Sequence, residues 1–151
     1  MHGRMRSITL LVVHCSAVRP YQTSSAADID EWHKRRVTRN GEHWKGIGYH
    51  FVVRRDGTVE KGRPIEEQGA HCCPHNRYSI GICYEGGLDV SGKADDTRTP
   101  EQKRVLRELL EDLHQRFPEA VIVGHRDLTH DRECPCFDAV REYQELQPPD
   151  G

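Results

Sequence analysis

The sequence predicts a mixed α/β fold in which helices pack on a central mixed β-sheet. Three observations support this prediction. Short β-rich apolar runs recur along the 151 residues, an Asp56-Gly57 pair marks a hairpin, and residues 99–117 carry apolar positions at helical spacing. A chain of this length is most simply one domain, and we expect residues 1–151 to form it.

The first predicted strand covers residues 8–14, whose near-continuous apolar run is typical of a strand buried on both faces. After a loop, Ser24 or Ser25 is expected to cap a helix. On this helix we place Trp32 in the core and His33 at the surface.

Residues 37–48 are polar and contain glycine, which indicates a loop. Residues 49–54 then alternate as a strand, and the Asp-Gly turn leads into a second strand at 58–61. Residues 79–84 form another apolar run, so we expect a further strand there.

The long helix has a visible start signal. Thr99 is expected to cap it, and Pro100 takes the first helical position, where its missing N–H costs nothing. Gln102 can complete a capping box. We expect residues 121–123 to return to the sheet and residues from 138 onward to form a short terminal helix.

The charge pattern argues against nucleic acid as a partner. The formal net charge is −2, which gives no overall attraction to nucleic acid or to a membrane surface. Residues 31–63 nevertheless hold nine Lys and Arg against four Asp and Glu. This basic segment either faces an anionic polymer or is a solvated surface.

Targeting signals are not recognisable in the sequence. No apolar run reaches the ~20 residues of a transmembrane helix, and the run near the N-terminus is too short for a secretory signal. We therefore expect a protein that is cytoplasmic when synthesised and that does not insert into a membrane. Six cysteines and ten histidines in such a chain favour reduced thiols and a metal site over a disulfide framework.

His14, His125 and Cys134 stand at predicted strand ends or just beyond them. Two imidazoles and one thiolate with an open fourth position have the chemistry of a catalytic zinc site. The spacing alone is not specific, and Cys136 is an alternative thiol ligand. Cys15 is expected to point to the opposite face of the strand from His14, into the core.

Six motifs follow one another along residues 8–138: Val12-Val13-His14-Cys15-Ser16-Ala17, Ile47-Gly48-Tyr49-His50-Phe51, Arg55-Asp56-Gly57-Thr58-Val59-Glu60, Ser79-Ile80-Gly81-Ile82-Cys83, Gly124-His125-Arg126-Asp127 and Cys134-Pro135-Cys136-Phe137-Asp138. In this order they resemble the zinc-dependent N-acetylmuramoyl-L-alanine amidases of type 2. This family includes phage lysozyme-type amidases and peptidoglycan recognition proteins. The resemblance is greatest to compact phage or prophage endolysins, and it implies a central mixed sheet flanked by helices.

The resemblance implies that a zinc-bound water hydrolyses the amide between the lactyl group of muramic acid and L-alanine in peptidoglycan. Carried over by position, the Zn²⁺ ligands are His14, His125 and Cys134, and the active-site tyrosine is Tyr49. Arg132 stands where the phage enzymes have a lysine. Arginine stays charged at any working pH, so it can stabilise negative charge but cannot cycle a proton as a lysine can.

His71 and Asn76 resemble residues that line the family's groove, and we predict that they bind substrate; the alternative for both is a role in holding their loop. Tyr49, with an ordinary pKa near ~10, is better suited at neutral pH to donate a hydrogen bond than to act as a base. The implied partner is the muropeptide stem of peptidoglycan. We expect a monomer that acts on the cell wall after its release.

Three other functions stay open at this point. A non-catalytic peptidoglycan-binding module would share the fold, but such members typically lack the cysteine ligand, whereas Cys134 is present here. A zinc hydrolase of another amide would use the same site chemistry. A regulatory role through the N-terminal segment, as in one phage member of the family, is the third.

Overall fold

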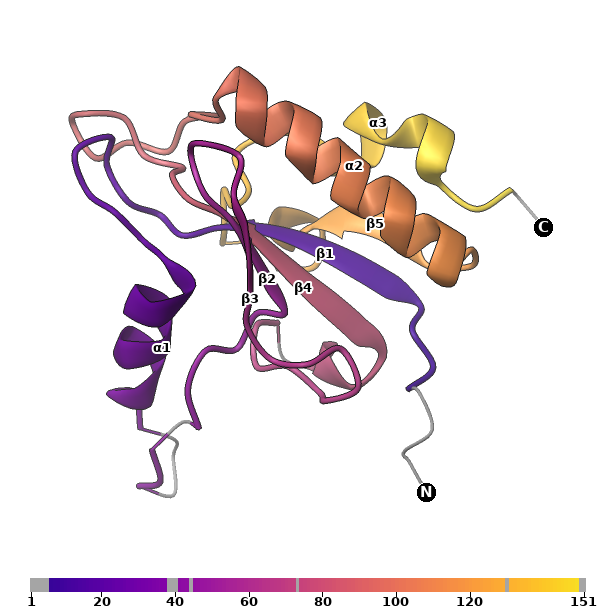
Figure 1. Cartoon of the computed structure of the whole chain (residues 1–151), viewed down its shortest axis with the longest axis horizontal. Coiled ribbons are helices and arrows are strands. Elements are labelled where there is room, and N and C mark those ends of the chain that lie inside the picture. The colour runs from indigo at the N-terminus through magenta and orange to yellow at the C-terminus, as the bar shows by residue number, and fades with distance from the viewer. Residues whose placement is uncertain (1–5, 38–40, 44, 73, 130, 150–151) are drawn as a thin grey trace.

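A five-stranded sheet forms the centre of the computed structural model, which describes residues 6–37, 41–43, 45–72, 74–129 and 131–149. The strand order is β3-β2-β4-β1-β5 (Figure 1). β2 and β3 are antiparallel, and every other neighbouring pair is parallel, so the predicted mixed sheet is confirmed. The strands are β1 (Leu10–Cys15), β2 (Phe51–Val53), β3 (Val59–Lys61), β4 (Ser79–Tyr84) and β5 (Val121–Gly124).

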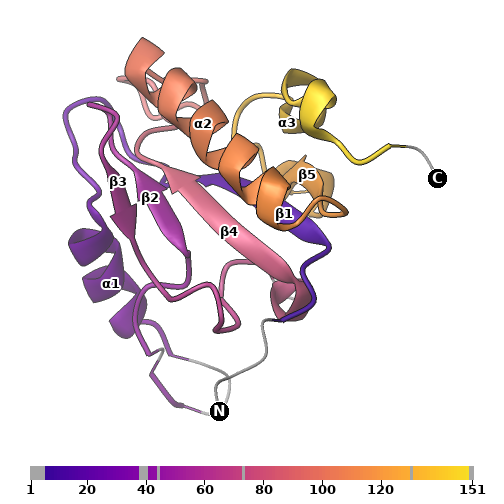
Figure 2. The same cartoon turned by 45° about the vertical axis from the view of Figure 1, so that its right-hand side comes forward.

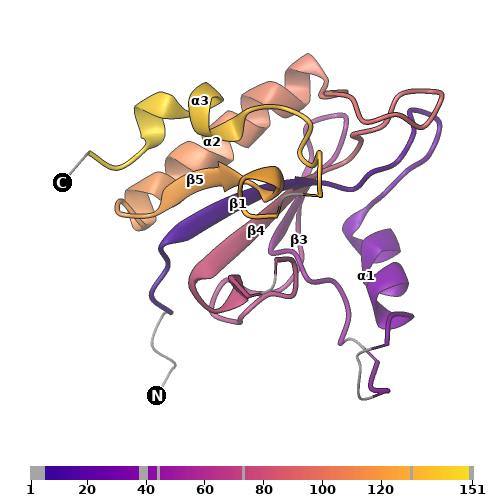
Figure 3. The ribbon, with the colours of Figure 1, turned by 180° about the vertical axis from the view of Figure 1, so that it is seen from behind.

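Helices lie on both sides of this sheet. α2 (Pro100–Arg116) and α3 (Ala139–Glu142) lie together on one side, and α1 (Ala26–Lys34) lies on the other, next to β3 (Figures 1 and 2). The segment that follows β5 lies beside the end of β1, as the view from behind shows (Figure 3). Single 3-10 turns complete the structure at η1 (Asn76–Tyr78), η2 (His125–Asp127) and η3 (Gln144–Leu146).

α2 has the predicted capping box. The Thr99 hydroxyl accepts from the Gln102 N–H, and the Gln102 side chain accepts from the Thr99 N–H. Pro100 occupies the first helical position. The helix packs its apolar face on the sheet, and the core between them contains Leu11, Val13, Ile80, Ile82, Leu106, Leu110 and Leu113, each at most 1% exposed.

α1 begins where the sequence predicts, but the prediction of which face is buried was wrong. Ser25 caps the helix, and Asp28 completes a capping box. Ile29 and His33, one turn apart, are buried, whereas Trp32 is 40% exposed. His33 is accommodated inside because its Nδ1 accepts a hydrogen bond from a backbone amide, which offsets the cost of burying the imidazole.

The remaining elements agree with the sequence. The Asp56-Gly57 turn joins β2 to β3, with Gly57 at a φ of +90°, which favours glycine. Asp138 caps α3. In the described part of the predicted loop at 37–48, the regular pairing is one isolated bridge between Val37 and His43.

The described cysteines are free thiols. Cys73 and His130 lie outside the described residues. Within the described chain, no helix combines the length and the apolar character needed to cross a bilayer.

Candidate metal centre and active-site pocket

Parallel pairing of β1 and β5 brings the two predicted histidine ligands to one end of the sheet. Val13 is paired with Gly124, so His14 and His125 each come one position later at the same edge. Because side chains alternate along a strand, His14 points away from the core that contains Val13 and Cys15. The prediction that Cys15 packs into the core is confirmed, since it is 6% exposed.

A short loop after β5 delivers the third ligand. The Arg126 N–H donates to the Cys134 carbonyl at 2.7 Å, which closes the segment between His125 and Cys134. At its start, the Asp127 carboxylate accepts from the Gly124 N–H at 2.7 Å. These two bonds explain how residues nine positions apart in the sequence meet at one site.

His14, His125 and Cys134 form a cluster in which one ligand atom from each lies within 4.8 Å of the others. The His14 and His125 ring centroids are 4.6 Å apart. The Cys15 N–H donates to Cys134 Sγ at 3.0 Å, an arrangement that stabilises a thiolate. Two imidazoles and a cysteine sulfur that accepts a backbone N–H suit zinc and leave a fourth position open. The residues present therefore fit a zinc ion.

Two further observations support this ligand set. Burial lowers the pKa of His14 well below its ordinary value, and the nearby His71 and His125 lower it further, so His14 stays neutral, as a metal ligand must. The alternative ligand Cys136 points elsewhere: its thiol donates to the Gly87 carbonyl at 3.3 Å. In the part of the chain that the structure describes, no other trio of His, Cys, Asp or Glu side chains has comparable geometry.

The cluster opens into a pocket of about 450 Å³. Six of the seven predicted site residues line it, and the seventh, His14, is buried beneath it with 1% exposure. The six come from three separate segments of the chain: Tyr49, His71, Asn76, His125, Arg132 and Cys134. The site residues predicted from the sequence therefore lie together at one pocket of the folded chain.

Tyr49 lies against the metal ligands. Its ring centroid is 5.0 Å from that of His14. Burial raises the pKa of Tyr49 well above its ordinary value, so the hydroxyl stays protonated at neutral pH. The backbone before it is held by the bond from the Gly48 N–H to His33 Nδ1, at 2.9 Å.

His71 and Asn76 have partners inside the protein. His71 Nδ1 is 2.9 Å from His14 Nε2, and His71 Nε2 is 3.1 Å from the Ser79 hydroxyl. Asn76 Oδ1 accepts from the N–H groups of His71 and Cys72. Burial lowers the pKa of His71 to about 3, so it too is neutral. The predicted contacts of His71 and Asn76 with substrate stay predictions.

Sequence reasoning missed two residues that line the pocket, His33 from α1 and Arg36 just after the end of that helix. The four-residue spacing of Ile29 and His33 was the available signal, because residues so spaced share one face of a helix. The partnership of Ser79 with His71 left no local signal, since it depends on how the loop that precedes β4 folds back against that strand.

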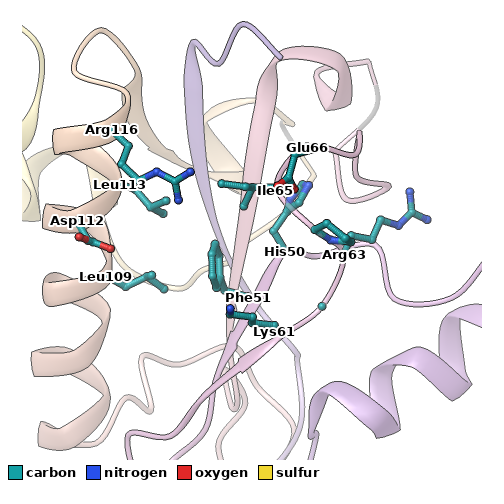
Figure 4. A pocket seen from close by; sticks show the side chains of 12 residues that line it. His50, Phe51, Lys61, Arg63, Ile65, Glu66, Leu109, Asp112, Leu113 and Arg116 are labelled. Atoms are coloured by element: carbon teal, nitrogen blue, oxygen red, sulfur yellow. The ribbon is translucent and has the colours of Figure 1, made fainter. Parts of the chain in front are cut away.

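A second cavity of about 470 Å³ lies between α2 and the hairpin side of the sheet (Figure 4). Leu109 and Leu113 from α2 and Phe51 from β2 line it, with charged side chains around them. It contains none of the predicted site residues. The chemistry therefore concentrates in the pocket above the metal ligands.

Comparison with known proteins supports the same conclusion. Residues 4–137 match the family model described as N-acetylmuramoyl-L-alanine amidase. The endolysin of Escherichia phage T7 is 39% identical over 138 residues, which cover 91% of this chain and 87% of the phage protein. These matches confirm the resemblance found in the sequence motifs.

Solved structures show the same fold. The endolysin LysCS from Clostridium intestinale URNW, an N-acetylmuramoyl-L-alanine amidase, superposes with a TM-score of 0.72 at 28% identity, over 93% of this chain and 82% of that one. Drosophila PGRP-LB superposes with a TM-score of 0.68 at 23% identity, over 97% and 82% of the two chains. The expected architecture, shared by amidases and peptidoglycan recognition proteins, is confirmed.

Proposed function

The chain belongs to the N-acetylmuramoyl-L-alanine amidase family, and we propose that it hydrolyses the amide between the lactyl group of muramic acid and L-alanine in peptidoglycan. One observation carries the proposal for this chain. His14, His125 and Cys134 cluster within 4.8 Å beneath a pocket that Tyr49 and Arg132 also line. The pocket thus combines a metal-binding set with a proton donor and a cation.

The proposed cofactor is Zn²⁺, held by His14, His125 and Cys134. Zinc in such a site lowers the pKa of a bound water toward ~7 and so provides a hydroxide nucleophile at neutral pH. The protein contributes the His14 imidazole, which burial keeps neutral by lowering its pKa, the His125 imidazole, and a sulfur that accepts the Cys15 N–H. The neutral His14 and the hydrogen bond to the sulfur favour the forms of these side chains that bind a metal.

Tyr49 and Arg132 take the two remaining chemical tasks in this proposal. The amide oxygen gains negative charge as the carbonyl is attacked, and a guanidinium beside it stabilises that charge. Arg132 supplies this cation and cannot release a proton. Tyr49 keeps its proton at neutral pH, so it is the group that can donate to the carbonyl oxygen or to the leaving nitrogen of L-alanine.

The substrate proposed for the pocket is the muropeptide stem. Arg36 and Arg132 line the pocket and give it positive charge, which suits carboxylates of a peptide stem. Asn76 lies in the same wall, and its amide nitrogen is the part suited to contact the stem. We further propose that the chain acts as a single-domain monomer on the cell wall, after its release from the cytoplasm.

Digestion of purified peptidoglycan tests the function. We expect new L-alanine amino groups without new reducing sugar ends, and about one zinc per chain by metal analysis. The matched control is Cys134→Ser, which removes a ligand but keeps a side chain of similar size, and we expect it to lose most of the zinc and the activity. New reducing ends would instead indicate a glycosidase. Binding to peptidoglycan without any product would indicate a binding module.

A further inference from the structure

We propose that His71 is a positioning residue for the metal centre: it fixes the ring orientation and the tautomer of His14, and Ser79 in turn fixes His71. This inference rests on the proposed zinc amidase function. In this proposal His71 acts by holding the metal ligand His14, and it does not bind the substrate directly.

The hydrogen-bond chain has one consistent set of proton positions if His14 binds a metal. His14 Nε2 is 2.9 Å from His71 Nδ1, which leaves His14 Nδ1 for the metal. A neutral imidazole has one N–H, so His14 must carry its proton on Nε2 and donate it to His71 Nδ1. His71 then carries its own proton on Nε2, which donates to the Ser79 hydroxyl at 3.1 Å.

The His71 ring sits in a socket that only glycines allow. A Cβ on Gly81, in β4, would lie 2.7 Å from the His71 ring atoms Cγ and Cδ2. A Cβ on Gly69 would lie 2.8 Å from His71 Cδ2 and equally close to Cε1 of His50. Real Cβ contacts are essentially never shorter than 3.0 Å, so Gly81 is kept clear for this ring, and Gly69 is kept clear for the ring together with the Gly48 carbonyl and His50.

The backbone of His71 is fixed as well. Asn76 Oδ1 accepts from the N–H groups of His71 and Cys72, at 3.0 and 2.9 Å. The His71 ring is perpendicular to the His14 ring, with centroids 4.9 Å apart. In this arrangement His71 Nδ1 lies 2.9 Å from His14 Nε2. With both ring nitrogens hydrogen-bonded and the ring packed on Gly81, His71 is held where it can fix the orientation of His14.

Such partners of metal ligands affect metal affinity directly. Losing the acceptor for a histidine ligand's N–H typically lowers metal affinity or activity by about 10–100-fold. The acceptor here is an imidazole nitrogen on a neutral ring. Its basicity depends on the hydrogen bond to Ser79, so removing the Ser79 hydroxyl should have a smaller effect in the same direction.

Two substitutions at His71 separate positioning from mere packing. In His71→Asn, the amide oxygen takes roughly the place of Nδ1 and can still accept from His14. In His71→Gln, the longer side chain carries its amide to the place of Nε2, so this acceptor is lost. We would measure the zinc dissociation constant by competition with a chromophoric chelator, and the absorption of the Co²⁺-loaded proteins as a readout of ligand geometry.

We expect His71→Gln to weaken zinc binding by about 10–100-fold and to change the Co²⁺ spectrum, with His71→Asn closer to the wild type. We expect Ser79→Ala to weaken binding less. His75→Gln is the matched control, because His75 lies in the same loop but bonds to the Tyr78 hydroxyl and does not line the pocket. Circular dichroism of the zinc-free proteins checks that each variant folds.

Wild-type zinc affinity and an unchanged Co²⁺ spectrum in His71→Gln would overturn the proposal, and a raised KM in that case would return His71 to substrate binding. Equal losses in His71→Asn and His71→Gln would also overturn it, since only packing would then matter. A wild-type protein that binds zinc but leaves peptidoglycan intact would refute the proposed function alone. The affinities would still decide the role of His71.

Discussion

Replacing His33 with asparagine should flatten the pH dependence of folding stability. His33 is 6% exposed, and its Nδ1 accepts from the Gly48 N–H. Burial, followed by the positive charges of Arg36 and Arg63, lowers the pKa of His33 to about 4. In the unfolded chain, His33 therefore becomes protonated near pH 6.5, whereas in the folded chain it becomes protonated only near pH 4. Stability is full above pH 6.5 and falls as the pH drops through this window.

The expected magnitude follows from these two pKa values. One pKa unit corresponds to about 1.36 kcal/mol, so lowering the pH from 7 to 5 should cost about 2 kcal/mol through His33. With an m-value of about 2 kcal/mol per molar urea, the unfolding midpoint should move by about 1 M. Asparagine can still accept from the Gly48 N–H but does not titrate, so His33→Asn should lose this part of the pH dependence.

The assay is urea unfolding followed by circular dichroism at pH 7, 6 and 5, with a chelator present so that metal binding does not contribute. Other buried histidines titrate in both proteins, and their effect cancels when the wild type and His33→Asn are compared. His43→Asn, at an exposed position, controls for the loss of a histidine as such. Equal changes in the free energy of unfolding with pH in the wild type and His33→Asn would refute the reasoning.

Three further predictions concern the site and the core. Tyr49→Phe should keep stoichiometric zinc but lower kcat by about 10²–10³-fold, and an unchanged rate would remove Tyr49 from the mechanism. Arg132→Met should lower kcat by about 10²-fold while Arg132→Lys keeps most of it; equal losses in the two variants would show that the positive charge is not what matters. Leu110→Ala, in the fully buried face of α2, should reduce the free energy of unfolding by about 2–5 kcal/mol, and a loss below about 1 kcal/mol would contradict the packing seen here.

Local signals in the sequence predicted most of the elements. The predicted strand at 79–84 has the bounds of β4, and the start of α2 follows from Thr99 and Pro100 because a capping box is complete within four residues. The three metal ligands could be proposed because strand ends supply two of them and the family motifs supply all three. Their clustering in the structure supports the choice of Cys134 over Cys136.

What the sequence did not predict depends on contacts between distant segments. The burial of His33 on α1 is supported by the Gly48 amide, whose hydrogen bond to the imidazole comes from a distant segment and cannot be read from the helix sequence. An exposed Trp32 is likewise set by what packs on α1. The bond between His71 and His14 joins residues 57 positions apart, and Gly81 in β4 leaves the room that the His71 ring occupies.

The metal centre joins residues from near both ends of the chain, and this affects the stability of the fold. The Cys15 amide and the Cys134 sulfur that meet there are 119 positions apart, so a metal bound by His14 and Cys134 acts as a cross-link between the two ends of the fold. A link across so long a loop restricts the unfolded chain, much as a disulfide would, by an amount on the order of 4–5 kcal/mol in the chain-entropy model. A metal bound at this site would therefore stabilise the fold as well as supply the chemistry.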